Sequence, residues 1–146
     1  MLISQTKNPE SGFNFSNATA FQAFSDDPIN STTSGTYQTK LSGSSGTDDQ
    51  ANYIMQWYCE LANSTNNGTT LFRAQWKNTS SGTWINLTEI DSYIGRSSVY
   101  VPVNGFKIIT NTITDTIDFR LQYAVGSGGT ASIKNANFYL FEVLPT

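Results

Sequence analysis

The sequence predicts an all-β fold, namely an antiparallel β-sandwich or jelly roll of about seven or eight strands. Apolar residues occupy every second position from Ile117 to Tyr123, and Asp118, Arg120 and Gln122 lie between them. This alternation is typical of an antiparallel strand that is buried on one face. Turn signals recur about every 8 to 12 residues, and no stretch has the periodicity of an amphipathic helix of ordinary length.

Further strands are expected between turns rich in Gly, Asn and Ser. Residues 71–77 alternate clearly, with Phe72, Ala74 and Trp76 on the inner face. The Asn67-Gly68 pair before them favours a type I′ turn. In chain order, the other strand candidates lie at 35–41, at 52–61, at 84–90 and at 99–110, the last split by Pro102 and an Asn104-Gly105 turn.

The chain closes with two predicted strands joined by a glycine-rich turn. The alternating strand at 117–123 is followed by a turn at 126–130 and a more apolar strand at 131–144. The glycines permit the positive φ angles of a tight reversal. We therefore expect a C-terminal hairpin. The apolar face of its first strand, from Ile117 to Tyr123, is expected to pack against Phe72, Ala74 and Trp76 or their equivalents.

Residues 1–30 differ from the jelly-roll domain predicted over 31–146. They contain four phenylalanines in a polar stretch with few aliphatic neighbours. One interpretation makes this segment the first strand of the sandwich. The other makes it an arm, in which Phe13 and Phe15 pack on a neighbouring subunit or a larger assembly.

The composition argues against several classes of function. At 146 residues the chain is expected to form one domain, and its net charge of −3 with scattered Lys and Arg does not favour nucleic-acid binding. The absence of histidine removes Ser-His-Asp and Cys-His catalysis and the usual zinc site. The single cysteine, Cys59, forms no intrachain disulfide and is interpreted as a buried apolar residue. We therefore expect a protein that is not an enzyme and has no cofactor or metal.

The first ten residues lack the apolar segment of a secretory signal, and no stretch approaches the roughly 18 apolar residues of a membrane span. We expect synthesis in a cytoplasm and no membrane partner.

The sequence offers candidates for two kinds of binding site. Asp48, Asp49 and Asn52 could supply some oxygen ligands for calcium, but Asp in such loops more often stabilises a turn. For sugar binding, Trp57 and Trp76 are interpreted as core residues. The surface ligand candidates are therefore residues that flank a loop: Tyr93, Arg96 and Tyr100.

Several segments carry a resemblance to a known group of proteins. They are residues 34–37, 53–61, 102–106, 116–123 and 128–136. Together they resemble the small jelly-roll virion proteins of tailed bacteriophages, which end on a D-x-x-x-Q-Y strand, a Gly-rich turn and an A-x-I-x-N-A strand. The chain also resembles the tumour-necrosis-factor-like sandwich, which commonly forms trimers.

The resemblance implies a non-enzymatic virion structural protein, most simply a bacteriophage capsid decoration or fibre protein that acts through assembly. Its expected partners are other virion proteins, such as the major capsid protein, and further copies of the chain, with a trimer favoured. It would be made in the host cytoplasm and located in the virion. The alternative is a glycan-binding module such as a receptor-binding tip, which an exposed aromatic cluster at one loop end would favour.

Overall fold

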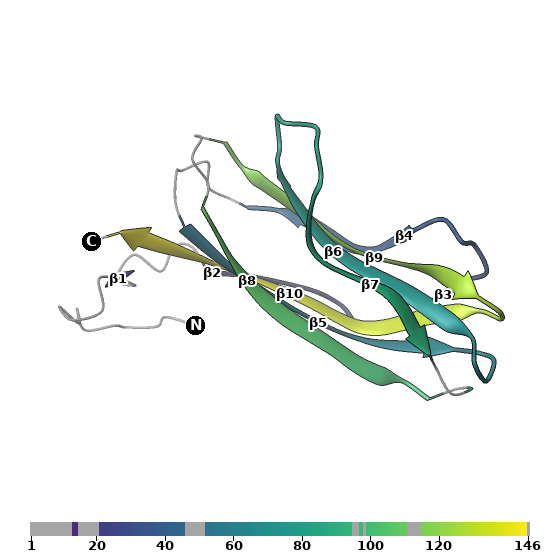
Figure 1. The fold of residues 1–146 in the computed structure, drawn as a ribbon. Coiled ribbons are helices and arrows are strands. Elements are labelled where there is room, and N and C mark those ends of the chain that lie inside the picture. The colour runs from purple at the N-terminus through teal and green to yellow at the C-terminus, as the bar shows by residue number, and fades with distance from the viewer. Residues whose placement is uncertain are drawn as a thin grey trace.

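The computed structural model describes residues 13–14, 21–45, 52–94, 97, 99–110 and 115–145, with only the backbone described at 13–14, 91–94 and 143–145. Within these ranges the regular secondary structure consists of ten β-strands and no helix. The strands form two antiparallel sheets stacked as a sandwich (Figure 1). The predicted all-β jelly-roll sandwich is confirmed.

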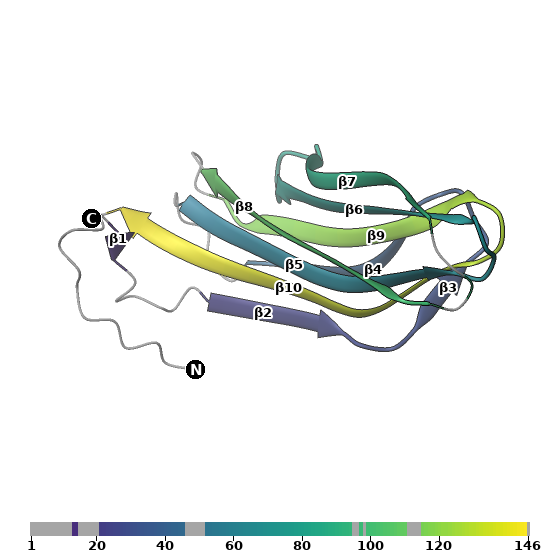
Figure 2. The same ribbon diagram turned by 60° about the horizontal axis from the view of Figure 1, so that its bottom comes forward.

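The larger sheet has β10 near its centre. One edge of β10 pairs in turn with β3, β2 and β1, and its other edge pairs with β5, which in turn pairs with β8 (Figure 2). Its strands are β1 (Phe13–Asn14), β2 (Phe21–Asp26), β3 (Asn30–Thr32), β5 (Asn52–Asn63), β8 (Val101–Thr110) and β10 (Ala131–Pro145).

The smaller sheet has the order β4-β9-β6-β7. Its strands are β4 (Gln38–Ser44), β6 (Thr69–Asn78), β7 (Ile85–Ile94) and β9 (Ile117–Ser127). The described strands outnumber the expected seven or eight, because β1, β2 and β3 are short segments without clear alternation.

The core lies between the sheets and uses the predicted alternating faces. Ile117, Phe119 and Leu121 have no exposed surface, and Tyr123 is 3% exposed. The ring of Phe119 stacks on Phe138 of the larger sheet with centroids 3.9 Å apart. Phe72, Ala74, Trp76, Trp57 and Cys59 are also buried, as predicted, and burial raises the pKa of the Cys59 thiol.

The predicted C-terminal hairpin is wrong. β9 pairs with β4 and β6, whereas β10 pairs with strands of the larger sheet, so the turn at 126–130 joins the two sheets. Gly128 and Gly129 do have positive φ angles of 62° and 64°. Phe72, Ala74 and Trp76 do lie beside the buried face of β9, as cross-strand neighbours of Tyr123, Leu121 and Phe119 in the same sheet. Alternation marks a buried face but does not identify the strand that pairs with it.

The turn between β5 and β6 also connects the two sheets. Asn67 has a φ of 65°, but Gly68 has no positive φ, so the predicted type I′ turn is wrong. Gly68 is required for another reason: a Cβ there would lie 2.2 Å from Oδ1 of Asn63. The buried Asn63 amide accepts hydrogen bonds from Thr65 and donates one to the carbonyl of Gly128. It therefore links the two turns that cross between sheets.

β8 is one continuous strand, so the predicted break at Pro102 and turn at Asn104-Gly105 are wrong. Pro102 is tolerated because β8 lies at the edge of the larger sheet. Gly105 leaves room for an indole, since a Cβ there would lie 2.5 Å from Cζ2 of Trp57.

The segment at 21–32 lies against β10 and is tied to the smaller sheet. The ring of Phe24 contacts that of Phe119 with centroids 4.7 Å apart. The ammonium of Lys40 on β4, which is fully buried, lies 3.0 Å from a carboxylate oxygen of Asp26. It also donates to Oδ1 of Asn30 at 2.6 Å. Lys40 thus connects β2 and β3 to the neighbouring edge of the smaller sheet.

Candidate interaction surfaces

The outer face of the larger sheet is apolar across four strands. One cross-strand row runs Phe21, Phe141, Ile54, Ile108, and the next runs Ala23, Tyr139, Gln56, Phe106. Phe106 is 67% exposed and Ile108 is 61% exposed. We call the large apolar side chains of these rows the apolar face: Phe21, Ile54, Phe106, Ile108, Tyr139 and Phe141.

Ring contacts join β2 and β10 within the apolar face. The ring of Phe21 lies 4.7 Å from that of Phe141 and 6.2 Å from that of Tyr139, centroid to centroid. Beside them a shallow hollow of about 260 Å³ includes Tyr58, Phe106 and Tyr139 in its lining. Its lining contains no charged side chain, so it suits an uncharged contact.

One end of the same sheet carries a charged cluster around Glu60. Its carboxylate accepts hydrogen bonds from the Tyr58 hydroxyl at 3.0 Å and the Asn135 amide at 2.9 Å, and lies 3.3 Å from the Lys134 ammonium. Desolvation alone would raise the pKa of Glu60, but these partners together hold it below its ordinary value. Asn135 has a φ of 50° and lies at the bulge in β10, which explains the Asn of the A-x-I-x-N-A pattern.

The outer face of the smaller sheet consists of hydrogen-bonding side chains. We call the following three cross-strand rows the polar face: Thr39, Gln122, Arg73, Glu89; Ser42, Arg120, Gln75, Asn86; and Ser44, Asp118, Lys77. Nε of Arg73 donates to Gln122, and Nε of Arg120 donates to Gln75, both at 2.8 Å.

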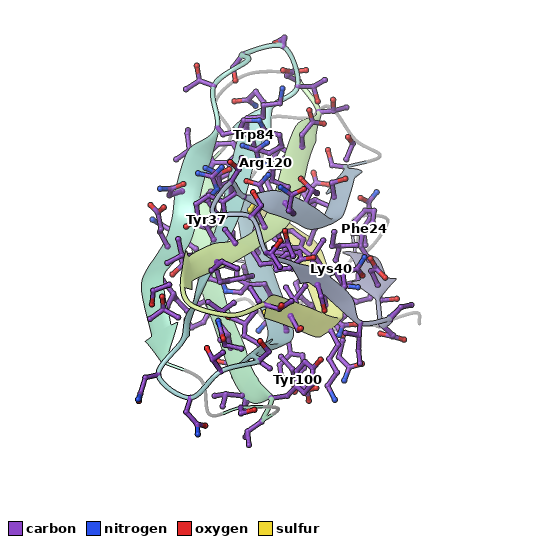
Figure 3. All side chains as sticks on the ribbon, turned by 90° about the vertical axis from the view of Figure 1, so that its right-hand side faces the viewer. Phe24, Tyr37, Lys40, Trp84, Tyr100 and Arg120 are labelled. Carbon is purple, nitrogen blue, oxygen red and sulfur yellow. The ribbon has the colours of Figure 1, made fainter. Side chains whose placement is uncertain are left out.

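Aromatic rings pack against both arginines of the polar face. The guanidinium carbon of Arg73 lies 3.9 Å from the ring centroid of Tyr37, and that of Arg120 lies 4.1 Å from that of Trp84. Figure 3 shows Arg120 beside Trp84, with Tyr37 nearby on the same side of the molecule. Burial lowers the pKa of Arg120, and the charge of Arg73 lowers it further.

The acidic residues near the end of the polar face hold loops and strands together. Asp115 accepts hydrogen bonds from the backbone and hydroxyl of Ser80, and these lower its pKa. Asp118 accepts from Ser44 and Thr79 and lies 3.8 Å from the Lys77 ammonium. Within the described ranges, no three His, Cys, Asp or Glu side chains are grouped to hold a metal. Asp48 and Asp49 lie outside the described residues.

The ligand candidates from the sequence are only partly described. Tyr93 lies on β7 with its backbone opposite Thr70, and Arg96 lies outside the described residues. Tyr100 is half-buried just before β8, and the Lys134 ammonium lies 4.2 Å from its ring centroid. The interpretation of these three as a ligand site therefore stays a prediction.

The two residues predicted to make assembly contacts, Phe13 and Phe15, are also only partly described. Phe13 lies on β1, with its backbone opposite Pro145 at the end of β10, and Phe15 lies outside the described residues. Both stay predictions. In the described part of the chain, no helix is long and apolar enough to cross a membrane.

Sequence reasoning missed the apolar face. The run from Phe138 to Phe141 is apolar at consecutive positions, which places large apolar side chains on both faces of β10. This run could have predicted the part of the apolar face that lies on β10. On β8, however, the proline and glycine concealed the strand that carries Phe106 and Ile108.

The fold is similar to that of solved structures from virus particles. A protein of infectious bursal virus-derived T=1 particles matches with a TM-score of 0.60 at 11% identity, over 84% of this chain and 32% of that chain. A protein of the infectious bursal disease virus Gt strain matches with a TM-score of 0.62 at 10% identity, over 97% of this chain and 38% of that chain. This chain therefore spans about a third of their length.

A second kind of neighbour is similar in size. The Eiger TNF of S. frugiperda matches with a TM-score of 0.55 at 9% identity, over 88% of this chain and 96% of that chain. No protein-family model matches the sequence, and comparison with curated proteins finds no match. At these identities the likeness establishes the sandwich fold.

Proposed function

We propose that this chain is a structural protein of a virion, specifically a capsid decoration or fibre protein of a tailed bacteriophage, which acts by assembly and not by chemistry. The fold shared with proteins of virus particles supports this proposal. The sequence resemblance to jelly-roll virion proteins supports the phage assignment.

The observation that carries the proposal is the exposed apolar face. Phe106 and Ile108 are more than half exposed, and they lie in rows with Phe21, Phe141, Ile54 and Tyr139. Large apolar side chains gathered on one face of a soluble domain mark an interaction site. Burial of each such side chain by a partner would contribute roughly 1.5–3 kcal/mol.

The partner would pack on the face of the sheet and not add a strand to its edge. At the edge of β8 that pairs with no described strand, Pro102 lacks a backbone donor and Lys107 is exposed. Proline and lysine at an edge strand discourage pairing with another strand. The apolar face beside this edge contains neither proline nor lysine.

The partner in the proposal is a second copy of the chain, with a trimer favoured, as in the tumour-necrosis-factor-like sandwiches that the chain resembles. The assembled oligomer would bind other virion proteins, such as the major capsid protein. We extend the proposal to Phe13 and Phe15 as further contacts with a neighbouring subunit or the shell.

Native mass spectrometry on a matched set of variants tests the proposal. The intact chain is expected to form an oligomer, and the double variant Phe106→Asp with Ile108→Asp is expected to be monomeric, because charges on the apolar face oppose its burial. Ile85→Asp is the control, since Ile85 is 50% exposed but lies on the smaller sheet. A monomeric intact chain with no affinity for phage shells, or equal disruption by the control, would contradict the proposal.

A further inference from the structure

The polar face holds two arginines in fixed positions near each other. Arg73 lies opposite Gln122 and Arg120 lies opposite Gln75 in the β6–β9 ladder, so the arginines occupy diagonal positions. Diagonal residues of an antiparallel pair are about 7–8 Å apart. The two side chains therefore leave the sheet from neighbouring positions, and the charge of Arg73 acts on Arg120.

Each guanidinium is held by a hydrogen bond and a ring. Gln122 accepts from Arg73 and donates to Thr39 at 3.0 Å, while Gln75 accepts from Arg120 and donates to Asn86 at 2.7 Å. These second bonds orient the glutamine oxygens toward the arginines. With Tyr37 and Trp84 packed against the guanidinium groups, both arginines are already ordered before any ligand binds.

Neither arginine has a carboxylate partner among the described side chains. The ion pairs there all involve lysines. Glu89 lies opposite Arg73, but its two oxygens accept from the Tyr37 hydroxyl at 3.3 Å and the Asn86 amide at 2.9 Å. The terminal nitrogens of Arg73 and Arg120 make no hydrogen bond to the described residues.

We propose that Arg73 and Arg120 form a binding site for the carboxylate of an acidic saccharide. Two neighbouring positive charges repel each other, and a bound anion removes that repulsion. The planar guanidinium donates two parallel hydrogen bonds to a carboxylate. The hydroxyls and amides of the surrounding rows, including Ser42 and Thr39, suit a ligand rich in hydroxyl groups.

This site is independent of the proposed assembly. It lies on the outer face of the smaller sheet, whereas the apolar face lies on the larger sheet. The polar face therefore stays exposed when assembly covers the apolar face, and the assembled protein can bind a glycan there.

Calorimetry on the full chain tests the site with short oligomers of galacturonate, glucuronate and sialic acid, each paired with its methyl ester. At least one acid is expected to bind while its ester does not. Arg73→Gln and Arg120→Gln are each expected to weaken binding by about 10- to 100-fold, the loss of a hydrogen bond to a charged group. Arg73→Lys keeps the charge but loses the paired donors, and a loss of about tenfold is expected.

Lys107→Gln is the control, because it removes the same charge from an exposed residue of β8 in the larger sheet. It should bind as the unmodified chain does, and so should the double variant Phe106→Asp with Ile108→Asp, which is designed to disrupt only assembly. Four results would overturn the proposal: no acid binds, esters bind equally, Lys107→Gln weakens binding as much as the arginine variants, or inorganic sulfate binds as tightly as the saccharides.

Discussion

Both sheets contribute buried apolar side chains to the core, but their outer faces differ. On the smaller sheet, each strand presents side chains that hydrogen-bond to the next strand, as in the chain from Arg120 through Gln75 to Asn86. On the larger sheet, the corresponding rows end on Phe106 and Ile108, which are mostly exposed. The comparison indicates that water can solvate the polar face, whereas the proposed assembly would cover the apolar face.

The largest expected effect separates the inner and outer faces of β9. Phe119 is fully buried between Phe24 and Phe138, so Phe119→Ala should lower the free energy of unfolding by about 3–5 kcal/mol. Arg120 is the next residue but points to the polar face, and Arg120→Ala should cost about 1 kcal/mol or less. Urea denaturation measures both. Equal costs would mean that the two faces of β9 are assigned wrongly.

The next effect concerns the ion pair that joins the edges of the two sheets. Asp26→Asn leaves the fully buried Lys40 ammonium without its counter-charge and should cost about 3 kcal/mol. Lys40→Met should cost less, because the Asp26 side chain is 34% exposed and can be solvated. Chemical denaturation measures the free energy of unfolding that each variant loses. A larger loss for Lys40→Met than for Asp26→Asn would contradict this account of the contact.

Deletion of residues 1–20 sharpens the account of the apolar face. The truncated chain keeps β2 from Phe21 onward, so its circular dichroism should stay that of a folded sandwich. If Phe13 and Phe15 contact a neighbouring subunit, the truncated chain should assemble less. Unfolding of the truncated chain would instead place these phenylalanines in the core of the domain, and the arm interpretation would be dropped.

The smallest effect is a pH dependence at the end of the larger sheet. The pKa of Glu60 is lowered from its ordinary value of 4.5, so the folded state binds this proton less readily than the unfolded state does. Its contribution to stability is complete above that ordinary value and is lost as the pH falls through the lower, folded-state pKa. Melting temperatures between pH 6 and pH 3 should therefore fall more for the unmodified chain than for Glu60→Gln. Parallel curves would show that the cluster around Glu60 does not stabilise the fold.

Much of the fold follows from alternation, but strand pairing does not. The period of two identified the buried sides of 71–77 and 117–123, because burial of one face is a local constraint on the sequence. It did not show that β9 and β10 belong to different sheets, since pairing depends on segments that are distant in sequence. Pro102 and Gly105 indicated a turn, yet an edge position and the indole of Trp57 explain them within a strand.

The surfaces were less predictable than the core. Alternation implies that Arg73, Arg120 and Gln122 point outward, but their mutual contacts depend on the β6–β9 register. The apolar face is assembled from β2, β5, β8 and β10, whose residues are far apart in the sequence. Apart from the consecutive apolar residues at 138–141, a single strand therefore contains too little of either surface to reveal it.

Hydroxyl-radical footprinting tests the central claim most directly, by comparing the assembled protein with the dissociated protein at low concentration. The claim is that assembly covers the apolar face and leaves the polar face in water. On assembly, oxidation of Phe106 and Tyr139 should fall several-fold, while oxidation of Tyr37 and Trp84 should stay unchanged. Protection of Tyr37 and Trp84 with no protection of Phe106 and Tyr139 would contradict the claim.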